Sequence, residues 1–236
     1  MVVHEAAFET PGGNWVRMLV RDDTSDWNTC NAITKVGDEY HLPKGQTGWA
    51  VDVGAHIGAW TVALLTDNPG MRCLAIEALP ENVELINGNL ALNGLTDRAM
   101  VVNAAASVDD EPVVVHYSTD PHHRFIGSGG GSGEAITLPT ITLTDIIHGL
   151  DRGLNVLGVD RVALLKIDCE GCEYPFLTSP DIERVDRIEG EVHFGSAQLR
   201  RILEPTHDVV FPAFDANPDF GPFTATRRVD QGEGPE

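Results

Sequence analysis

Several features that would assign this chain to a common class are missing from its sequence. It has no run of roughly 18 apolar residues, which excludes an ordinary membrane-spanning helix. Basic residues are scarce, because 16 lysines and arginines stand against 36 acidic residues. The resulting net charge of −20 disfavours nucleic acid and anionic membranes as partners. The same charge also favours solubility, and both interpretations stay open.

Cysteines are few, and the N-terminus has no basic stretch followed by an apolar one. We therefore expect no signal peptide and a cytoplasmic location. Cys169-x-x-Cys172 resembles a redox or metal pair, but it has no second pair or His-x-x-x-His nearby. We expect two reduced thiols in a tight strand-to-helix turn, and no metal site.

Length and composition fit one α/β domain. The 236 residues are 42% hydrophobic, which is enough for a full core. We predict a cap segment over residues 1–48, a ligand-binding catalytic domain over 49–230 and a disordered tail over 231–236.

The most informative stretch is Val51-Asp-Val-Gly-Ala-His-Ile-Gly-Ala-Trp-Thr61. It predicts a buried strand, a tight glycine turn at Gly54 and a helix that Gly58 allows to pack near the strand. Dinucleotide-binding enzymes use G-x-G-x-x-G here, and this chain lacks it. The carboxylate of Asp52 would repel a pyrophosphate, but it suits the ammonium group of S-adenosylmethionine.

A second carboxylate supports this cofactor. Cys73-Leu-Ala-Ile-Glu77 predicts the next strand, and Glu77 follows Asp52 by about 25 residues, the interval of one βαβ unit. A carboxylate in this position can accept hydrogen bonds from both ribose hydroxyls. Nicotinamide enzymes use the same contact, so the first turn is what favours S-adenosylmethionine.

Later segments predict the rest of an α/β domain. A long polar loop over 120–133 contains His122 and His123, and we interpret it either as a flexible linker or as a substrate loop. Helices are predicted from Pro80 and over Thr144–Leu150, the latter capped by Thr142 or Thr144. Further strands are predicted over Trp15–Arg21, Met100–Ala105, Val113–Tyr117, Arg161–Asp168, within Val185–Phe194, and as a hairpin of His207–Phe214 and Gly221–Arg228.

Three blocks together resemble one family. They are Val51 to Thr61, Ala75-Ile-Glu-Ala-Leu-Pro-Glu-Asn82, and Leu165-Lys-Ile-Asp-Cys-Glu-Gly-Cys-Glu-Tyr174. The chain resembles the FkbM-type class I methyltransferases over roughly residues 17–193. The third block is the most specific, whereas the first alone identifies only the cofactor class.

The resemblance implies a Rossmann-like, seven-stranded, mostly parallel sheet in the order 3-2-1-4-5-7-6, with helices on both faces and an N-terminal extension. It implies S-adenosylmethionine as donor of a methyl group, usually to a hydroxyl. By this resemblance the methionine end is lined by Asp52, Gly54 and Gly58, with His56 where Asn is common in the family. Glu77 would hold the ribose and Asp168 the sulfonium end, with Glu170 and Glu173 just beyond.

Transfer to a neutral hydroxyl needs a general base. The candidates at the ends of the fourth and fifth strands are Asp168, Glu170, Glu173 and His193. His193 has the most suitable intrinsic pKa, although a strand-end histidine is equally often structural. Asp168 and Glu170 could instead hold the methionine ammonium or orient the substrate. Tyr40, Glu173, His122 and His123 are candidates for substrate contact.

Four functions remain open. The first is O-methylation of a small molecule such as a sugar, polyketide or peptide-like metabolite. The second is methylation of an amine or carboxylate, which needs less base catalysis. A nicotinamide oxidoreductase is disfavoured by the missing G-x-G-x-x-G. A non-catalytic cofactor-binding protein is disfavoured by the acidic residues at three strand ends. The sequence does not indicate the oligomeric state.

Overall fold

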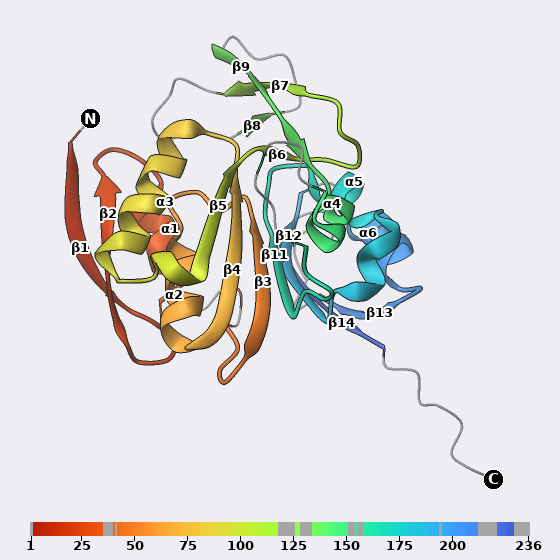
Figure 1. The fold of residues 1–236 in the computed structure, drawn as a ribbon, viewed down its shortest axis with the longest axis horizontal. Coiled ribbons are helices and arrows are strands. Elements are labelled where there is room, and N and C mark those ends of the chain that lie inside the picture. Colours follow the sequence, from red (N-terminus) through yellow and green to blue (C-terminus); the bar gives the residue numbers. More distant parts are fainter. Residues whose placement is uncertain are drawn as a thin grey trace.

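Seven strands form one central sheet in the computed structural model. The structure describes residues 2–34, 40, 42–117, 126–127, 134–150, 154, 158–193, 195–211 and 221–228. Along the sheet the strands lie in the order β13-β14-β12-β11-β3-β4-β5 (Figure 1). These strands are β3 (Thr47–Val53), β4 (Gly70–Glu77), β5 (Ala99–Asn103), β11 (Leu164–Ile167), β12 (Arg187–Val192), β13 (His207–Val210) and β14 (Gly221–Arg227).

Only β14 runs against its neighbours in this sheet. It pairs antiparallel with β12 and β13, whereas β5, β4, β3, β11 and β12 pair in parallel. Numbered along the chain, the order is 3-2-1-4-5-7-6 with the last strand reversed. The predicted Rossmann-like α/β fold is therefore confirmed.

The central strands are apolar because both of their faces are covered. All residues of β11 are buried, and side chains of β3 alternate between two cores. Val51 and Val53 pack on one side of the sheet, and Ala50 packs on the other. This burial on two faces explains why the strands appear in the sequence as continuous apolar runs.

Helices cover both faces of the sheet (Figure 1). One face carries α1 (Asp26–Ala32), α2 (Ala59–Asp67) and α3 (Pro80–Leu92), and the other carries α4 (Leu143–His148), α5 (Glu173–Leu177) and α6 (Ser196–Leu203). Two short 3-10 helices, η1 (Thr96–Arg98) and η2 (Pro180–Arg184), complete the set that the structure describes. Thr142, one of the two predicted caps, begins α4 in a capping box with Asp145.

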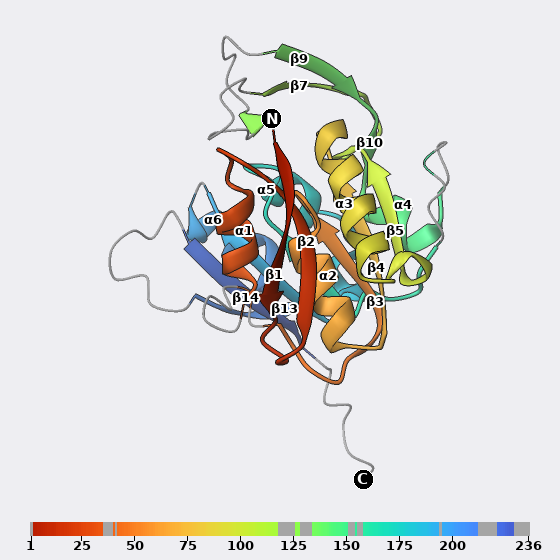
Figure 2. The same ribbon diagram turned by 90° about the vertical axis from the view of Figure 1, so that its left-hand side faces the viewer.

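An N-terminal hairpin extends this framework. β1 (Val3–Glu9) pairs with β2 (Trp15–Arg21), and β2 packs against α1, α2 and α3 (Figure 2). The backbone N–H of Leu19 donates to the side chain of Asn89 on α3, at 2.6 Å. The hairpin shares one hydrophobic core with α2 and α3, so β1 and β2 are packed into the domain. The tail 231–236 lies outside the described residues.

A small second layer of strands lies beyond the carboxyl end of the central sheet. The chain leaves through β6 (Ala105–Ala106) and returns through β10 (Thr140–Ile141), which pair in parallel. Between them, β7 (Val113–Tyr117), β8 (Ile126–Gly127) and β9 (Glu134–Leu138) form an antiparallel sheet (Figures 1 and 2). Most of the predicted 120–133 loop, including His122 and His123, lies outside the described residues.

None of the helices in the described part of the chain is both long enough and apolar enough to cross a membrane.

Candidate active site

A cavity of about 620 Å³ lies at the carboxyl ends of β3, β4 and β11. Gly54, Glu77 and Asp168, which end or follow these strands, all line it. After β3 the chain forms β4 on one side of β3, and it later returns to form β11 on the other side. The direction in which strands are added therefore reverses at β3. Open α/β sheets bind their ligands at such a switch point. Residues of α1 and β7 complete the wall, among them Asn28 and Val113.

Gly54 is required by the close packing of two loops. Its φ is +74°, and a Cβ there would collide with the backbone carbonyl of Asp168. The Asp168 N–H donates to the carbonyl of Val53 at 3.1 Å. Gly54 thus lines the cavity and also packs closely against the loop after β11. Gly58 caps α2 with a φ of +81° and packs against Ile86 outside the lining of the cavity.

Glu77 lines the cavity and also holds the first turn. Its carboxylate accepts hydrogen bonds from the backbone N–H of His56 at 2.8 Å, that of Leu79 at 2.9 Å and the side chain of Asn82 at 3.2 Å. Burial raises the pKa of Glu77 although these donors act in the opposite direction. A carboxylate has about four lone-pair sites, so about one remains for a hydroxyl in the cavity. That capacity fits one ribose hydroxyl better than the two expected from the sequence.

A buried polar network continues from Glu77 to the N-terminal hairpin. Arg21 donates to Asn82 at 2.8 Å and forms an ion pair with Asp26, also at 2.8 Å. The Nε2 atom of His56 lies 3.5 Å from Asp26. Burial and the nearby cations Arg21 and Lys166 lower the pKa of His56 to about 4, against the attraction of Asp26. His56 is therefore neutral at physiological pH, and it lines the cavity.

Asp52 has a different place from the one expected. It is fully buried and is not among the residues that line the cavity. Its carboxylate accepts from Thr61 at 2.6 Å and lies 3.3 Å from the Lys166 ammonium. Lys166 donates to the carbonyl of Gly54 at 2.7 Å and does line the cavity. In the structure, the ammonium partner of Asp52 is thus the side chain of Lys166.

Three acidic side chains lie between the end of β11 and the first residue of α5, each in a different environment. Asp168 accepts a hydrogen bond from the Tyr40 hydroxyl at 2.8 Å, and both residues line the cavity. Glu170, at a φ of +58°, is exposed on the cavity side. Glu173 is 1% exposed and accepts from the backbone N–H groups of Cys169 and Gly171. Glu173 therefore braces the loop and does not line the cavity.

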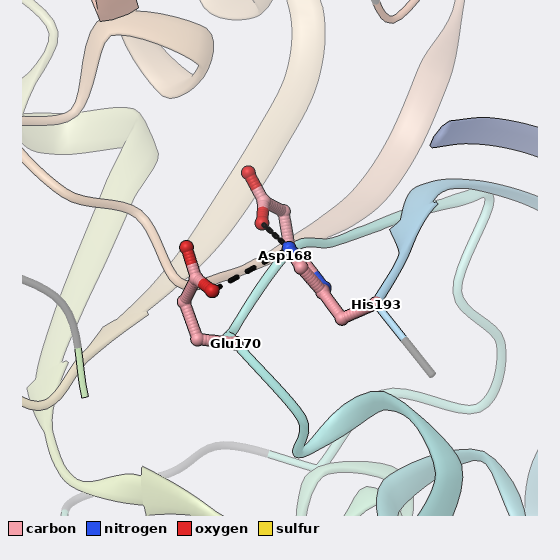
Figure 3. Close-up of side chains that lie close together, drawn as sticks. All are labelled: Asp168, Glu170 and His193. Atoms are coloured by element: carbon pink, nitrogen blue, oxygen red, sulfur yellow. Dashed lines mark ion pairs between the residues drawn. The ribbon is translucent and has the colours of Figure 1, made fainter. Parts of the chain in front are cut away.

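His193, directly after β12, lies among these carboxylates. Its Nδ1 is 2.9 Å from Glu173. Its Nε2 is 3.8 Å from Asp168 and 3.6 Å from Glu170 (Figure 3). Glu191, which lines the cavity, is 3.8 Å from the same nitrogen. Burial alone would lower the pKa of His193, but the hydrogen bond to Glu173 and the surrounding negative charge raise it to about 9.

Asp168, Glu170 and His193 also have the types of ligand atom that bind metals. These atoms lie within 4.8 Å of one another, a spacing that one divalent ion could span. Exposed acidic groups are also common without a metal ion. We assign no metal ion to it.

Cys169 and Cys172 form a disulfide, so the expectation of two reduced thiols is wrong for this structure. Both half-buried cysteines line the cavity. A sequence separation of three allows a turn that brings the two side chains together, but it does not give their oxidation state.

The structure brings together most of the predicted residues that it describes. Gly54, His56, Glu77, Asp168, Glu170 and Tyr40 line one cavity, and His193 lies just behind them. Sequence reasoning assigned no role to Lys166, Asn82 or Glu191. Asn82 and Lys166 stand in two of the three blocks, and Glu191 lies two residues before His193 in the strand predicted within 185–194. A charged residue inside the apolar run of β11 is the available signal for Lys166.

Comparisons with known proteins agree with this geometry. The family model described as the methyltransferase FkbM domain matches residues 52–214. No curated protein sequence matches the chain.

Solved structures share the fold at low sequence identity. TYW2 of M. jannaschii, in complex with AdoMet, has a TM-score of 0.51 and 12% identity, over 97% of this chain and 89% of that one. TrmK of M. capricolum, in complex with S-adenosyl-homocysteine, has a TM-score of 0.50 and 8% identity, over 82% of this chain and 67% of that one. At such identities the likeness shows the fold alone.

Proposed function

This chain belongs to the family of the methyltransferase FkbM domain, and we propose that it transfers the methyl group of S-adenosylmethionine to a hydroxyl of a small molecule. The acceptor class is a sugar, a polyketide or a peptide-like natural product. The observation that carries O-methylation is the contact of 2.9 Å between Glu173 and Nδ1 of His193, next to the cavity.

The cavity fits the cofactor in size and in chemistry. Its volume of about 620 Å³ lies within the usual range for small-molecule sites. Glu77 has acceptor capacity left for a ribose hydroxyl, and the carboxylates of Asp168 and Glu170 suit a positively charged group. S-adenosylmethionine supplies a methyl group made electrophilic by its sulfonium. The residues that would hold it come from the ends of β4 and β11.

The proposed general base is His193. When Nδ1 carries a proton and donates it to Glu173, Nε2 is left as the acceptor that faces Asp168 and Glu170. Nε2 of His193 would take the proton of the acceptor hydroxyl as that oxygen is methylated. The nearby carboxylates stabilise the imidazolium that forms. Because the pKa of His193 is about 9, the basic form becomes more abundant as the pH rises toward that value.

The charge of the lining supports a small acceptor over a polyanionic one. Glu77, Asp168, Glu170 and Glu191 contribute carboxylates, whereas Lys166 is the one ammonium or guanidinium group among the described lining residues. Lys166 is held by Asp52 and by the carbonyl of Gly54. A chain of phosphates would meet net repulsion here.

The cofactor site is tested by calorimetric titration with S-adenosylhomocysteine. We expect binding in the wild type and at least a tenfold loss in Glu77→Gln, since an amide cannot accept the same set of donors. Glu84→Gln is the matched control, because Glu84 is an exposed carboxylate on α3, the helix that follows β4. Absence of binding in a folded wild-type protein would overturn the proposal.

The acceptor class is tested by mass spectrometry after incubation with S-adenosylmethionine and hydroxylated metabolites. We expect that compounds with a free hydroxyl are methylated and that the corresponding methyl ethers are not. The rate of methylation should fall at least about 100-fold in His193→Gln. His148→Gln is the control, because His148 is half-exposed on α4 and pairs with Asp181. Methylation of amines or carboxylates that does not depend on His193 would support the alternative acceptors.

A further inference from the structure

The Cys169–Cys172 disulfide lies in the wall of the cavity, and none of the catalytic roles above uses it. Both of its cysteines are half-buried, so the bridge is accessible from the cavity. The other two cysteines differ sharply. Cys30 and Cys73 are fully buried, and burial raises the pKa of both thiols, that of Cys30 to about 12. The chain therefore separates an accessible sulfur pair from two inert thiols.

The bridge closes the loop that carries the acidic side chains. β11 ends at Ile167 and α5 begins at Glu173, so the disulfide encloses Glu170 and Gly171 between these two elements. Glu170 and Gly171 have φ values of +58° and +113°, a conformation that an open chain rarely keeps at a glutamate. Asp168 stands just before the ring and Glu173 just after it. Opening the ring frees the chain between the residues that surround His193.

We propose that Cys169 and Cys172 form a thiol–disulfide exchange site, in which the oxidised pair holds the cavity in its binding form and reduction weakens ligand binding. The inference rests on the proposed function, because its ligand is the nucleoside cofactor. The reductant is a dithiol, either a small molecule or a protein with a pair of cysteines. One of its thiolates attacks a sulfur of the bridge, forms a mixed disulfide and releases the other protein thiol. Its second thiol then attacks the reductant's own sulfur in the mixed disulfide and releases the remaining protein thiol. Two electrons and two protons pass to Cys169 and Cys172, and the reductant becomes a disulfide.

Binding and oxidation state must influence each other to the same extent. If the oxidised form binds the ligand more tightly by some factor, the bound ligand favours the oxidised form by that factor. A ligand in the cavity also lies between the bridge and an approaching reductant, since the sulfur atoms belong to residues of the cavity wall. Occupancy should therefore both slow reduction and make it less favourable.

The test uses the whole chain with dithiothreitol as reductant and S-adenosylhomocysteine as ligand. Calorimetry gives the dissociation constant of the oxidised and of the fully reduced protein, and thiol counting in dithiothreitol redox buffers gives the reduction potential. We expect at least tenfold tighter binding by the oxidised form. We also expect saturating ligand to lower the potential by at least about 30 mV, which is a tenfold ratio for a two-electron couple.

A Cys169→Ser/Cys172→Ser variant is the control for the reductant itself. It should bind like the reduced wild type and should not respond to dithiothreitol, because Cys30 and Cys73 are buried. If this variant fails to fold, the comparison of oxidised and reduced wild type still decides. Equal binding by the two forms with an unchanged potential overturns the exchange site and leaves the proposed function standing. Absence of binding in both folded forms overturns both proposals.

Discussion

Gly54 and Asp168 are packed backbone against backbone, with the carbonyl oxygen of Asp168 in the space that a side chain on residue 54 would need. This contact joins the turn after β3 to the loop after β11. Gly54→Ala should therefore lower the free energy of unfolding by about 3 kcal/mol or more, since it combines a positive φ with a backbone collision.

Urea unfolding followed by circular dichroism measures this cost. Gly94→Ala is the matched control, because Gly94 has a similar φ of +67° but nothing within 4 Å of the added carbon. It should cost only about 1 kcal/mol. Equal losses in the two variants would show that the collision with Asp168 has no effect.

Substitution of Asp168 should act mainly on ligand binding, and substitution of Asp52 should act mainly on stability. Asp168→Asn removes a charge from the cavity wall and should weaken S-adenosylhomocysteine binding about tenfold or more. Asp52→Asn breaks the buried pair with Lys166 and should cost about 3 kcal/mol of stability while changing affinity by less than about threefold. Calorimetry and urea unfolding separate the two effects. A stronger loss of affinity in Asp52→Asn would place the ligand against Asp52 instead.

His56 should make the protein less stable as the pH falls. Its pKa in the folded protein is about 4, below the usual value of about 6.5, so the unfolded chain binds more protons between these values. This one group should remove about 2 kcal/mol of stability between pH 7 and pH 5.

His56→Asn should lose less stability over that interval, because asparagine does not titrate there. Asparagine also tolerates the φ of +53° that His56 adopts. The measurement is the free energy of unfolding of both proteins at the two pH values. The same pH dependence in both would contradict a neutral His56 in the folded protein.

Glu173 should control the pKa of His193. Replacing it with glutamine removes a charge at 2.9 Å, so the pKa of His193 should fall from about 9 toward its ordinary value by about one unit or more. The limb of the pH–rate profile that reports the base should shift to lower pH. NMR titration of the ring nitrogens checks the shift without an acceptor, and an unchanged pKa would remove Glu173 from this role.

The two forms of the cofactor should differ in proton release. The negative charge that raises the pKa of His193 comes from Glu173, Glu170, Asp168 and Glu191, and a bound sulfonium competes for the same charge. At about pH 8, S-adenosylmethionine should therefore release more protons on binding than the uncharged S-adenosylhomocysteine. Calorimetry in buffers with different ionisation enthalpies measures the difference. Equal release would mean that the sulfonium does not interact with this group.

The central strands could be predicted because they are buried on both faces and end at or next to acidic residues, whereas their order was implied by the family resemblance. The first helix, α1, was harder to predict from the sequence. α1 has the sequence Asp26-Trp-Asn-Thr-Cys-Asn-Ala32, with no apolar stripe, and it follows residues typical of a turn. It forms because Asp26 is held by Arg21 and because Cys30 is buried against the hairpin and α2.

The residues of the site could be located from strand ends, but their partners could not. Asp52 and Lys166 lie on adjacent strands in direct register, and only the pairing of β3 with β11 reveals it. The same applies to Glu173, which appears in the sequence as one more acidic residue near the site. Its burial and its contact with His193 depend on how β12 and α5 are packed.

The network from Arg21 through Asn82 to Glu77 bears on how this protein can be divided into fragments. The stretch matched by the family model starts at residue 52, yet the hydrogen-bond network that supports Glu77 begins in β2. It ends at residue 214, before β14, the strand that joins β12 to β13. A fragment cut at the limits of the match would lack β14, so the edge of β12 would be unpaired. It would also lack Arg21, whose guanidinium donates to Asn82. The unit that folds is therefore larger than the segment by which the family is recognised.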